Sequence, residues 1–112
     1  MNIQIFGKKK CQETKKAERF FKERRIKFQR IDLMTKSISQ GELSSIIKAV
    51  GLDNLLNEDS PFYEESLIPY TSDMERKKEL IEEYPEVLWT PIVRNGKEAT
   101  VGYKPDVWKN WK

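Results

Sequence analysis

The chain has 112 residues, of which 21 are basic and 18 acidic, for a net charge of +3. This length predicts one domain over residues 1–112, and 38% hydrophobic residues support one modest core. One cysteine and no histidine are present. This composition excludes an internal disulfide and a histidine-activated nucleophile, and no metal site is expected.

Three further expectations follow from the composition. No apolar run approaches the roughly 18 residues of a membrane-spanning helix, and the N-terminus lacks a signal-peptide pattern. We therefore expect a cytoplasmic protein with a reduced thiol and no membrane partner. The charge balance is too mild for a nucleic-acid-binding surface, so no direct contact with nucleic acid is expected. The expected oligomeric state is a monomer.

The first third of the sequence predicts a β-α-β unit. A short apolar run at residues 3–6 ends at Gly7 and predicts a buried strand. Residues 12–25 carry apolar side chains at helical spacing and predict an amphipathic helix. Residues 26–33 predict a second strand. This order implies a parallel strand pair joined by a right-handed crossover.

The middle of the sequence predicts helices joined by a polar loop. Ser39 begins a capping signature for a helix that ends before Gly51, and a short turn follows. Thr71 or Ser72 is expected to cap the next helix, which ends before Pro85.

The last quarter of the sequence predicts a β-hairpin followed by a short helix. The segment 87–93 is apolar but contains Pro91, which argues against an ordinary central strand. The Asn-Gly pair at 95–96 is a strong hairpin signal, and residues 99–103 supply the returning strand. Residues 107–111 predict a short helix with one apolar side. All three tryptophans are expected to pack in the core, and a nucleic-acid stacking platform is the less favoured alternative.

Cys11 stands where the first predicted strand gives way to the first predicted helix. Helix N-termini present unpaired amide N–H groups and a partial positive charge. We therefore expect the amides of Gln12, Glu13 and Thr14 to face the sulfur and to favour the thiolate. The Thr14 hydroxyl is expected to donate to the same sulfur. The same amides could also hold an oxyanion.

Lysine residues bracket the cysteine in the sequence. Lys9, Lys10 and Lys15 are expected to support the thiolate through their positive charge. The alternative is that these lysines form an ordinary solvated face. Cys11 itself could equally be an inert structural cysteine, because free cysteine is among the most buried residue types.

A series of short segments spans nearly the whole chain. The segments are Ile3-Gln4-Ile5-Phe6, Cys11-Gln12-Glu13-Thr14-Lys15-Lys16-Ala17, Ile31-Asp32-Leu33, Ser39-Gln40-Gly41-Glu42-Leu43, Tyr84-Pro85, Thr90-Pro91-Ile92-Val93 and Val101-Gly102-Tyr103. In this order they resemble the arsenate-reductase-like family, which includes glutaredoxin-dependent arsenate reductases (ArsC) and the transcriptional regulator Spx. The resemblance implies an α/β, thioredoxin-like fold. Its mixed sheet would have about four strands, with a helical insertion between a β-α-β half and a β-β-α half.

The resemblance also implies a function and a site. The chain would be a thiol-dependent oxidoreductase with Cys11 as its nucleophile. It would need no bound cofactor, because glutathione or a glutaredoxin would restore the thiol. The resemblance further implies a cis peptide bond between Thr90 and Pro91, packed beside the cysteine.

The sequence departs from this family at the oxyanion-binding arginines. Thr90 and Tyr103 stand where two of the three arginines of arsenate reductases are expected, and the loop 57–69 contains no arginine. Arg94 does not align with a family position and is expected to be an exposed strand-end charge, a displaced anion ligand being the alternative. Threonine and tyrosine cannot replace the bidentate charge of arginine, which argues against arsenate as the substrate.

A regulator similar to Spx is the alternative function. The segment 101–103 is more similar to Spx than to the reductases, which would imply binding to RNA polymerase without turnover. Spx senses oxidants through a Cys-x-x-Cys pair, and Thr14 occupies the second position here. An oxidised Cys11 would therefore need an external thiol. A third possibility is a family member that keeps the scaffold and has lost catalysis.

Overall fold

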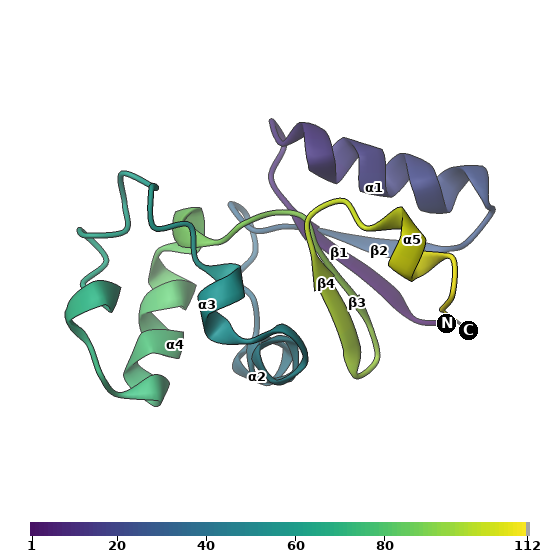
Figure 1. The fold of residues 1–112 in the computed structure, drawn as a ribbon. Coiled ribbons are helices and arrows are strands. Elements are labelled where there is room, and N and C mark those ends of the chain that lie inside the picture. The colour runs from purple at the N-terminus through teal and green to yellow at the C-terminus, as the bar shows by residue number, and fades with distance from the viewer. Residues whose placement is uncertain (112) are drawn as a thin grey trace.

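A computed structural model describes residues 1–111 and shows two β-containing halves separated by a helical segment (Figure 1). The first half contains β1 (Ile3–Gly7), α1 (Gln12–Glu23) and β2 (Phe28–Asp32). The helical segment contains α2 (Gln40–Val50), α3 (Leu52–Leu55), the 3₁₀ helix η1 (Ile68–Tyr70), α4 (Met74–Glu83) and the 3₁₀ helix η2 (Pro85–Val87). The last half contains β3 (Ile92–Asn95), β4 (Glu98–Val101) and α5 (Pro105–Trp108).

The four strands form one mixed sheet in the order β2-β1-β3-β4. β1 pairs with β2 in parallel, as the β-α-β pattern predicts, and it pairs with β3 antiparallel. In this register Ile5 of β1 lies between Arg30 of β2 and Val93 of β3. β3 and β4 form the predicted hairpin. The predicted mixed sheet of about four strands is confirmed.

A small aromatic core lies on one face of the sheet, beneath α1 and α5 (Figure 1). Its centre is Trp108, whose ring lies 5.2 Å from the rings of both Phe20 and Phe21. The Trp108 indole Nε1 donates a hydrogen bond to Thr100 Oγ1 at 2.7 Å, so the buried indole is not left unpaired. The buried residues of this core are Ile3, Ile5, Ala17, Phe20, Phe21, Val93, Trp108 and Trp111.

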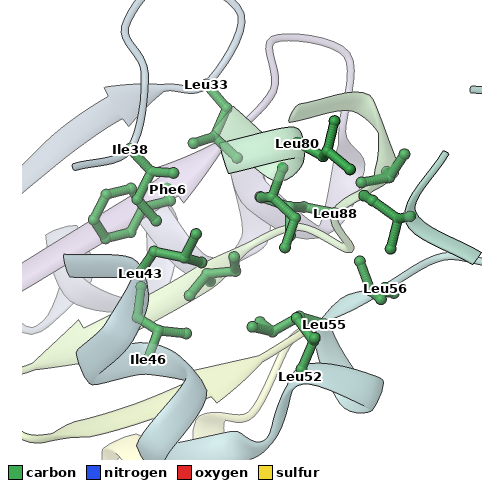
Figure 2. Packing of buried hydrophobic residues seen from close by; sticks show 14 of the residues in the cluster. Phe6, Leu33, Ile38, Leu43, Ile46, Leu52, Leu55, Leu56, Leu80 and Leu88 are labelled. Carbon is green, nitrogen blue, oxygen red and sulfur yellow. The ribbon is translucent and has the colours of Figure 1, made fainter. Parts of the chain in front are cut away.

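A larger aliphatic core lies against the opposite face, where α2, α3 and α4 pack (Figure 2). Phe6 of β1 reaches this core, whereas Ile5 reaches the aromatic one, because successive side chains of a strand point to opposite faces. Its buried residues are Phe6, Ile31, Leu33, Ile38, Leu43, Ile46, Leu52, Leu55, Leu56, Ile68, Leu80, Ile81, Val87, Leu88 and Ile92. The central strand β1 is therefore buried from both sides. This burial fixes the end of β1 from which the chain continues to Cys11.

The N-terminus of α4 differs from the prediction. Neither Thr71 nor Ser72 caps the helix. The cap is Asp73, whose side chain accepts a hydrogen bond from the Arg76 amide at 3.0 Å. All three residue types are good N-caps, so the local sequence alone could not select among them.

The prediction for the tryptophans is right for two of the three. Trp108 and Trp111 are buried, with 1% and 9% of their surface exposed. Trp89 is 47% exposed, so its predicted core position is wrong. It directly precedes Thr90, in the connection between η2 and β3, and it is exposed although the preceding Leu88 is buried. Among the helices of residues 1–111, none combines the length and the apolar character that crossing a bilayer requires.

Candidate active site

Cys11 is the N-cap residue of α1, as the sequence predicts. A tight turn after β1 brings it there, with the Cys11 amide donating to the Lys8 carbonyl at 3.1 Å. Cys11 has an extended backbone (φ −83°, ψ 114°), and its own carbonyl accepts a hydrogen bond from the Lys15 amide at 3.3 Å. The cysteine is partly exposed. Its sulfur therefore lies at the positive end of a helix dipole and is accessible to solvent.

The surroundings of the sulfur favour its thiolate form. Burial is the largest single influence, and it raises the pKa of the Cys11 thiol. Donor groups near the sulfur, on the side chains of Thr14 and Thr90 and the amides of Thr14 and Glu13, outweigh it, so the pKa lies below its ordinary value. Of the three amides predicted to face the sulfur, those of Glu13 and Thr14 act on it. A thiol with a lowered pKa is a stronger candidate for reaction at neutral pH than an ordinary one.

Thr14 is positioned by an unusually close contact with β1. Its side chain is buried, with 2% of its surface exposed. A Cβ atom on Gly7 would overlap it, lying 2.7 Å from Thr14 Oγ1. Sequence reasoning used Gly7 only as a strand end and missed this role. The available signal was a glycine placed directly between a buried strand and a helix start.

The Thr14 hydroxyl makes no hydrogen bond among residues 1–111, although it lies close enough to the Cys11 sulfur to lower the pKa of the thiol. Leaving a buried hydroxyl unpaired costs about 1–3 kcal/mol. An ionised sulfur would accept its proton, whereas a neutral thiol accepts weakly. The Thr14 hydroxyl is therefore placed to donate a hydrogen bond to the Cys11 thiolate, whereas the neutral thiol would be a weak acceptor for it.

The segment that precedes β3 forms the other side of the site. The Thr90–Pro91 peptide bond is cis. The Cys11 thiol donates to the Thr90 carbonyl oxygen across a distance of 3.5 Å. The Pro91 carbonyl accepts a hydrogen bond from the Gly102 amide at 2.8 Å, which ties this segment to the end of β4. Thr90, predicted from the family pattern, thus lies beside the cysteine, and Pro91 follows it through the predicted cis bond.

The lysines around Cys11 differ from one another. Lys9, Lys10 and Lys15 are exposed. Lys8, which sequence reasoning left out of the site, is half-buried, and its Nζ donates to the carbonyls of Glu86 at 3.3 Å and Leu88 at 3.0 Å. The signal for Lys8 was its place in the basic cluster, nearest to the end of the strand.

Arg94 has a different environment from the one expected. It is partly buried in β3, opposite Gln4 of β1, so the prediction of an exposed strand-end charge is wrong. Its Nη1 donates to Gln4 Oε1 at 2.7 Å, and Gln4 Nε2 donates to Glu42 Oε2 at 2.9 Å. Arg94 is partly buried because β3 pairs with the central strand β1 at this position. Its guanidinium links the sheet to α2 through these hydrogen bonds.

Tyr103, at a family arginine position, belongs to the C-terminal packing. Its ring lies 5.6 Å from that of Trp108, and the Lys16 ammonium lies 5.9 Å from the Tyr103 ring centroid. The donor groups that lower the pKa of the Cys11 thiol are hydroxyls and amides. Within residues 1–111, no cluster of histidine, cysteine or carboxylate side chains could hold a metal ion.

Comparisons with known proteins agree with this arrangement. The ArsC family model matches residues 6–111. The chain is 26% identical to the global transcriptional regulator Spx 2 of Oceanobacillus iheyensis, covering 100% of this chain and 94% of the relative. Among solved structures it is similar to an arsenate reductase from Vibrio cholerae, with a TM-score of 0.82, 20% identity and coverage of 96% and 94%. It is also similar to the glutaredoxin-like protein NrdH-redoxin from Escherichia coli, with a TM-score of 0.51, 15% identity and coverage of 100% and 96%.

These likenesses confirm the predicted thioredoxin-like α/β fold. The family match covers the cysteine, the helix that it caps and the cis-proline segment beside it. The chain belongs to the ArsC family.

Proposed function

We propose that this protein is a thiol-dependent oxidoreductase in which Cys11 is the nucleophile. The observation that carries the proposal is the position of Cys11 at the N-terminus of α1, where hydroxyl and amide donors lower the pKa of its thiol. The thiolate is the reactive form of cysteine in nucleophilic attack and in disulfide exchange. Partial exposure of Cys11 gives a reaction partner access to it.

The proposed reaction is thiol–disulfide exchange with an external partner. The Cys11 thiolate attacks one sulfur of a disulfide, a new S–S bond forms, and the departing sulfur carries away the electron pair as a thiolate. The chain has no second cysteine to resolve this mixed disulfide. A second external thiol, such as glutathione or the cysteine of a glutaredoxin, must attack it and release Cys11. The protein itself would need no bound cofactor.

Arsenate is a weaker candidate substrate than a disulfide. Arsenate is an oxyanion that arginine holds well through two parallel hydrogen bonds. Thr90 and Tyr103 occupy two of the expected arginine positions, and Arg94 is engaged with Gln4. A reduced thiol requires a reducing compartment, so we also propose a cytoplasmic location.

Two measurements test this proposal. The alkylation rate of Cys11 by iodoacetamide, followed against pH, should show a thiol that ionises below the ordinary value of about 8.5. Incubation with oxidised glutathione should add one glutathione to the protein, seen by mass spectrometry and removed by reduced glutathione. Cys11→Ser is the control and should acquire neither modification. A thiol that ionises at or above the ordinary value and forms no mixed disulfide would overturn the proposal.

The second candidate is a regulator that binds a protein partner without turnover, such as RNA polymerase. It is supported by the likeness to a global transcriptional regulator over the full length of the chain. A pull-down with purified RNA polymerase tests it, using the wild type and Cys11→Ser. Equal recovery of polymerase with both proteins supports a binding role that is independent of the thiol. No recovery with either protein removes this candidate.

A further inference from the structure

We infer that Lys8 is a positioning residue for Cys11. Lys8 ties the loop between β1 and α1 to the cis-proline segment before β3, and it supplies a positive charge that supports the thiolate. This inference rests on the proposed thiol chemistry of Cys11. It adds a residue and a mechanism that neither the family match nor the pattern around the cysteine indicates.

The hydrogen bonds of Lys8 join two distant parts of the chain. Lys8 directly follows β1 and lies three residues before Cys11. Its Nζ donates to the carbonyls of Glu86 and Leu88, which are 78 and 80 residues away along the chain. Leu88 lies two residues before Thr90, whose carbonyl faces the Cys11 sulfur. One side chain therefore bridges the two segments between which the sulfur lies.

This bridge is more than a surface contact. An ammonium group has three N–H donors, and the two carbonyls use two of them. Burial holds the pKa of Lys8 below its ordinary value and outweighs the negative charges of Cys11 and Glu86, which act in the opposite direction. Two titrating groups affect each other reciprocally. The Lys8 charge must therefore favour the Cys11 thiolate by the same free energy with which the thiolate favours the Lys8 ammonium.

The charged groups around Lys8 define what its loss would change. The negative charge of the Glu86 carboxylate in η2 also acts on the ammonium, and Glu86 Oε1 is buried with no hydrogen-bond partner among residues 1–111. Lys9 and Lys10 are exposed, so water and salt screen their charges. Without Lys8, the site would keep the Glu86 carboxylate and lose the half-buried Lys8 ammonium. The thiolate would then lose a favourable positive charge and be left with the unfavourable negative charge of Glu86.

Three substitutions of Lys8 separate its charge from its hydrogen bonds. Lys8→Gln keeps N–H donors and removes the charge, Lys8→Arg keeps both, and Lys8→Met removes both. Lys27→Gln is the matched control, because Lys27 is exposed and precedes Phe28, which pairs with Ile3 at the opposite end of β1. The readouts are the pH profile of Cys11 alkylation and the thermal unfolding temperature of each variant.

The expected results differ in a way that a purely structural role would not produce. Lys8→Gln should lower the alkylation rate at neutral pH about three- to tenfold and shift the profile to higher pH, because an opposite charge nearby favours ionisation. Lys8→Arg should restore most of the rate, and Lys27→Gln should match the wild type. Lys8→Met should show the same shift and also unfold at a lower temperature.

The outcomes also separate this inference from the proposed function. An unchanged pH profile in Lys8→Gln, with a low wild-type thiol pKa, refutes the role of Lys8 and leaves the Cys11 proposal intact. A wild-type thiol that ionises at the ordinary value overturns the Cys11 proposal itself, and with it the role of Lys8.

Discussion

Replacing Thr14 with valine should make the protein more stable and its cysteine less reactive. Valine has nearly the same shape as threonine and lacks the hydroxyl. In the folded protein, Thr14 Oγ1 is buried and makes no hydrogen bond among residues 1–111. A buried polar group without a hydrogen bond costs about 1–3 kcal/mol. We therefore expect Thr14→Val to raise the free energy of unfolding by about 1 kcal/mol when Cys11 is a neutral thiol.

The same substitution removes a donor to the thiolate. The Thr14 side chain is the strongest of the influences that lower the pKa of Cys11. A hydrogen bond to a charged group contributes about 1.5–3 kcal/mol, and each 1.4 kcal/mol is a factor of ten. The sulfur is partly exposed, so solvent reduces this contribution. We expect the thiolate fraction at neutral pH, and with it the alkylation rate, to fall about three- to tenfold.

The assay combines urea denaturation with alkylation of Cys11 over a range of pH. Thr100→Val is the matched control, since Thr100 is also buried but its hydroxyl accepts the Trp108 indole N–H at 2.7 Å. This control should lose stability, by about 1–3 kcal/mol, and keep the wild-type thiol profile. Our reasoning would be refuted if Thr14→Val were less stable than the wild type while its thiol profile remained unchanged.

Two further predictions concern stability. Gly7→Ala places a Cβ against the Thr14 side chain, and this overpacking should cost about 1–3 kcal/mol in thermal unfolding. Gly41→Ala is the comparison, because a Cβ at Gly41 of α2 would meet open space, and this variant should gain about 0.5 kcal/mol of stability. Equal unfolding temperatures for the two variants would contradict the close contact between Gly7 and Thr14. Burial raises the pKa of Glu42, but hydrogen bonds, first that with Ser39, hold it below its usual range. A carboxyl group whose pKa is lower in the folded than in the unfolded state stabilises the protein at pH values above the ordinary carboxyl range. This stabilisation is lost as the pH falls through the folded-state pKa. The wild type should thus be more stable than Glu42→Gln at neutral pH, and urea denaturation should show the difference shrinking towards about pH 3; a constant difference would speak against it.

Local patterns predicted those parts of the fold that local physics controls. The capping box of α2 is an example, because its two hydrogen bonds join residues three apart: the Ser39 hydroxyl accepts from the Glu42 amide, and the Glu42 carboxylate accepts from the Ser39 amide. The cap of α4 could not be selected, since Thr71, Ser72 and Asp73 offer the same chemistry within three residues. Only the path of the chain into α4 decides that Asp73 takes the role.

In the candidate site, too, local sequence predicts some residues, and long-range contacts decide the others. Cys11 and Thr14 could be predicted because the strand-to-helix transition places both within one helical turn. The bond from Lys8 to Leu88 could not, because it joins residues 80 apart. Arg94 shows the same limit, since its cover and its partner Gln4 depend on the pairing of β3 with β1.

Cys11 at a helix start, a β-α-β beginning and a hairpin near the C-terminus were all determined by the sequence on its own, through periodicity, capping residues and turn chemistry. The tertiary structure alone decided which groups distant in the sequence reach the sulfur. The register of β1 against β3 brings Thr90 to one side of Cys11, and Lys8 to the backbone that leads there. The physical reason is that long-range strand pairing and core burial, rather than neighbouring residues, determine which distant groups meet at the thiol.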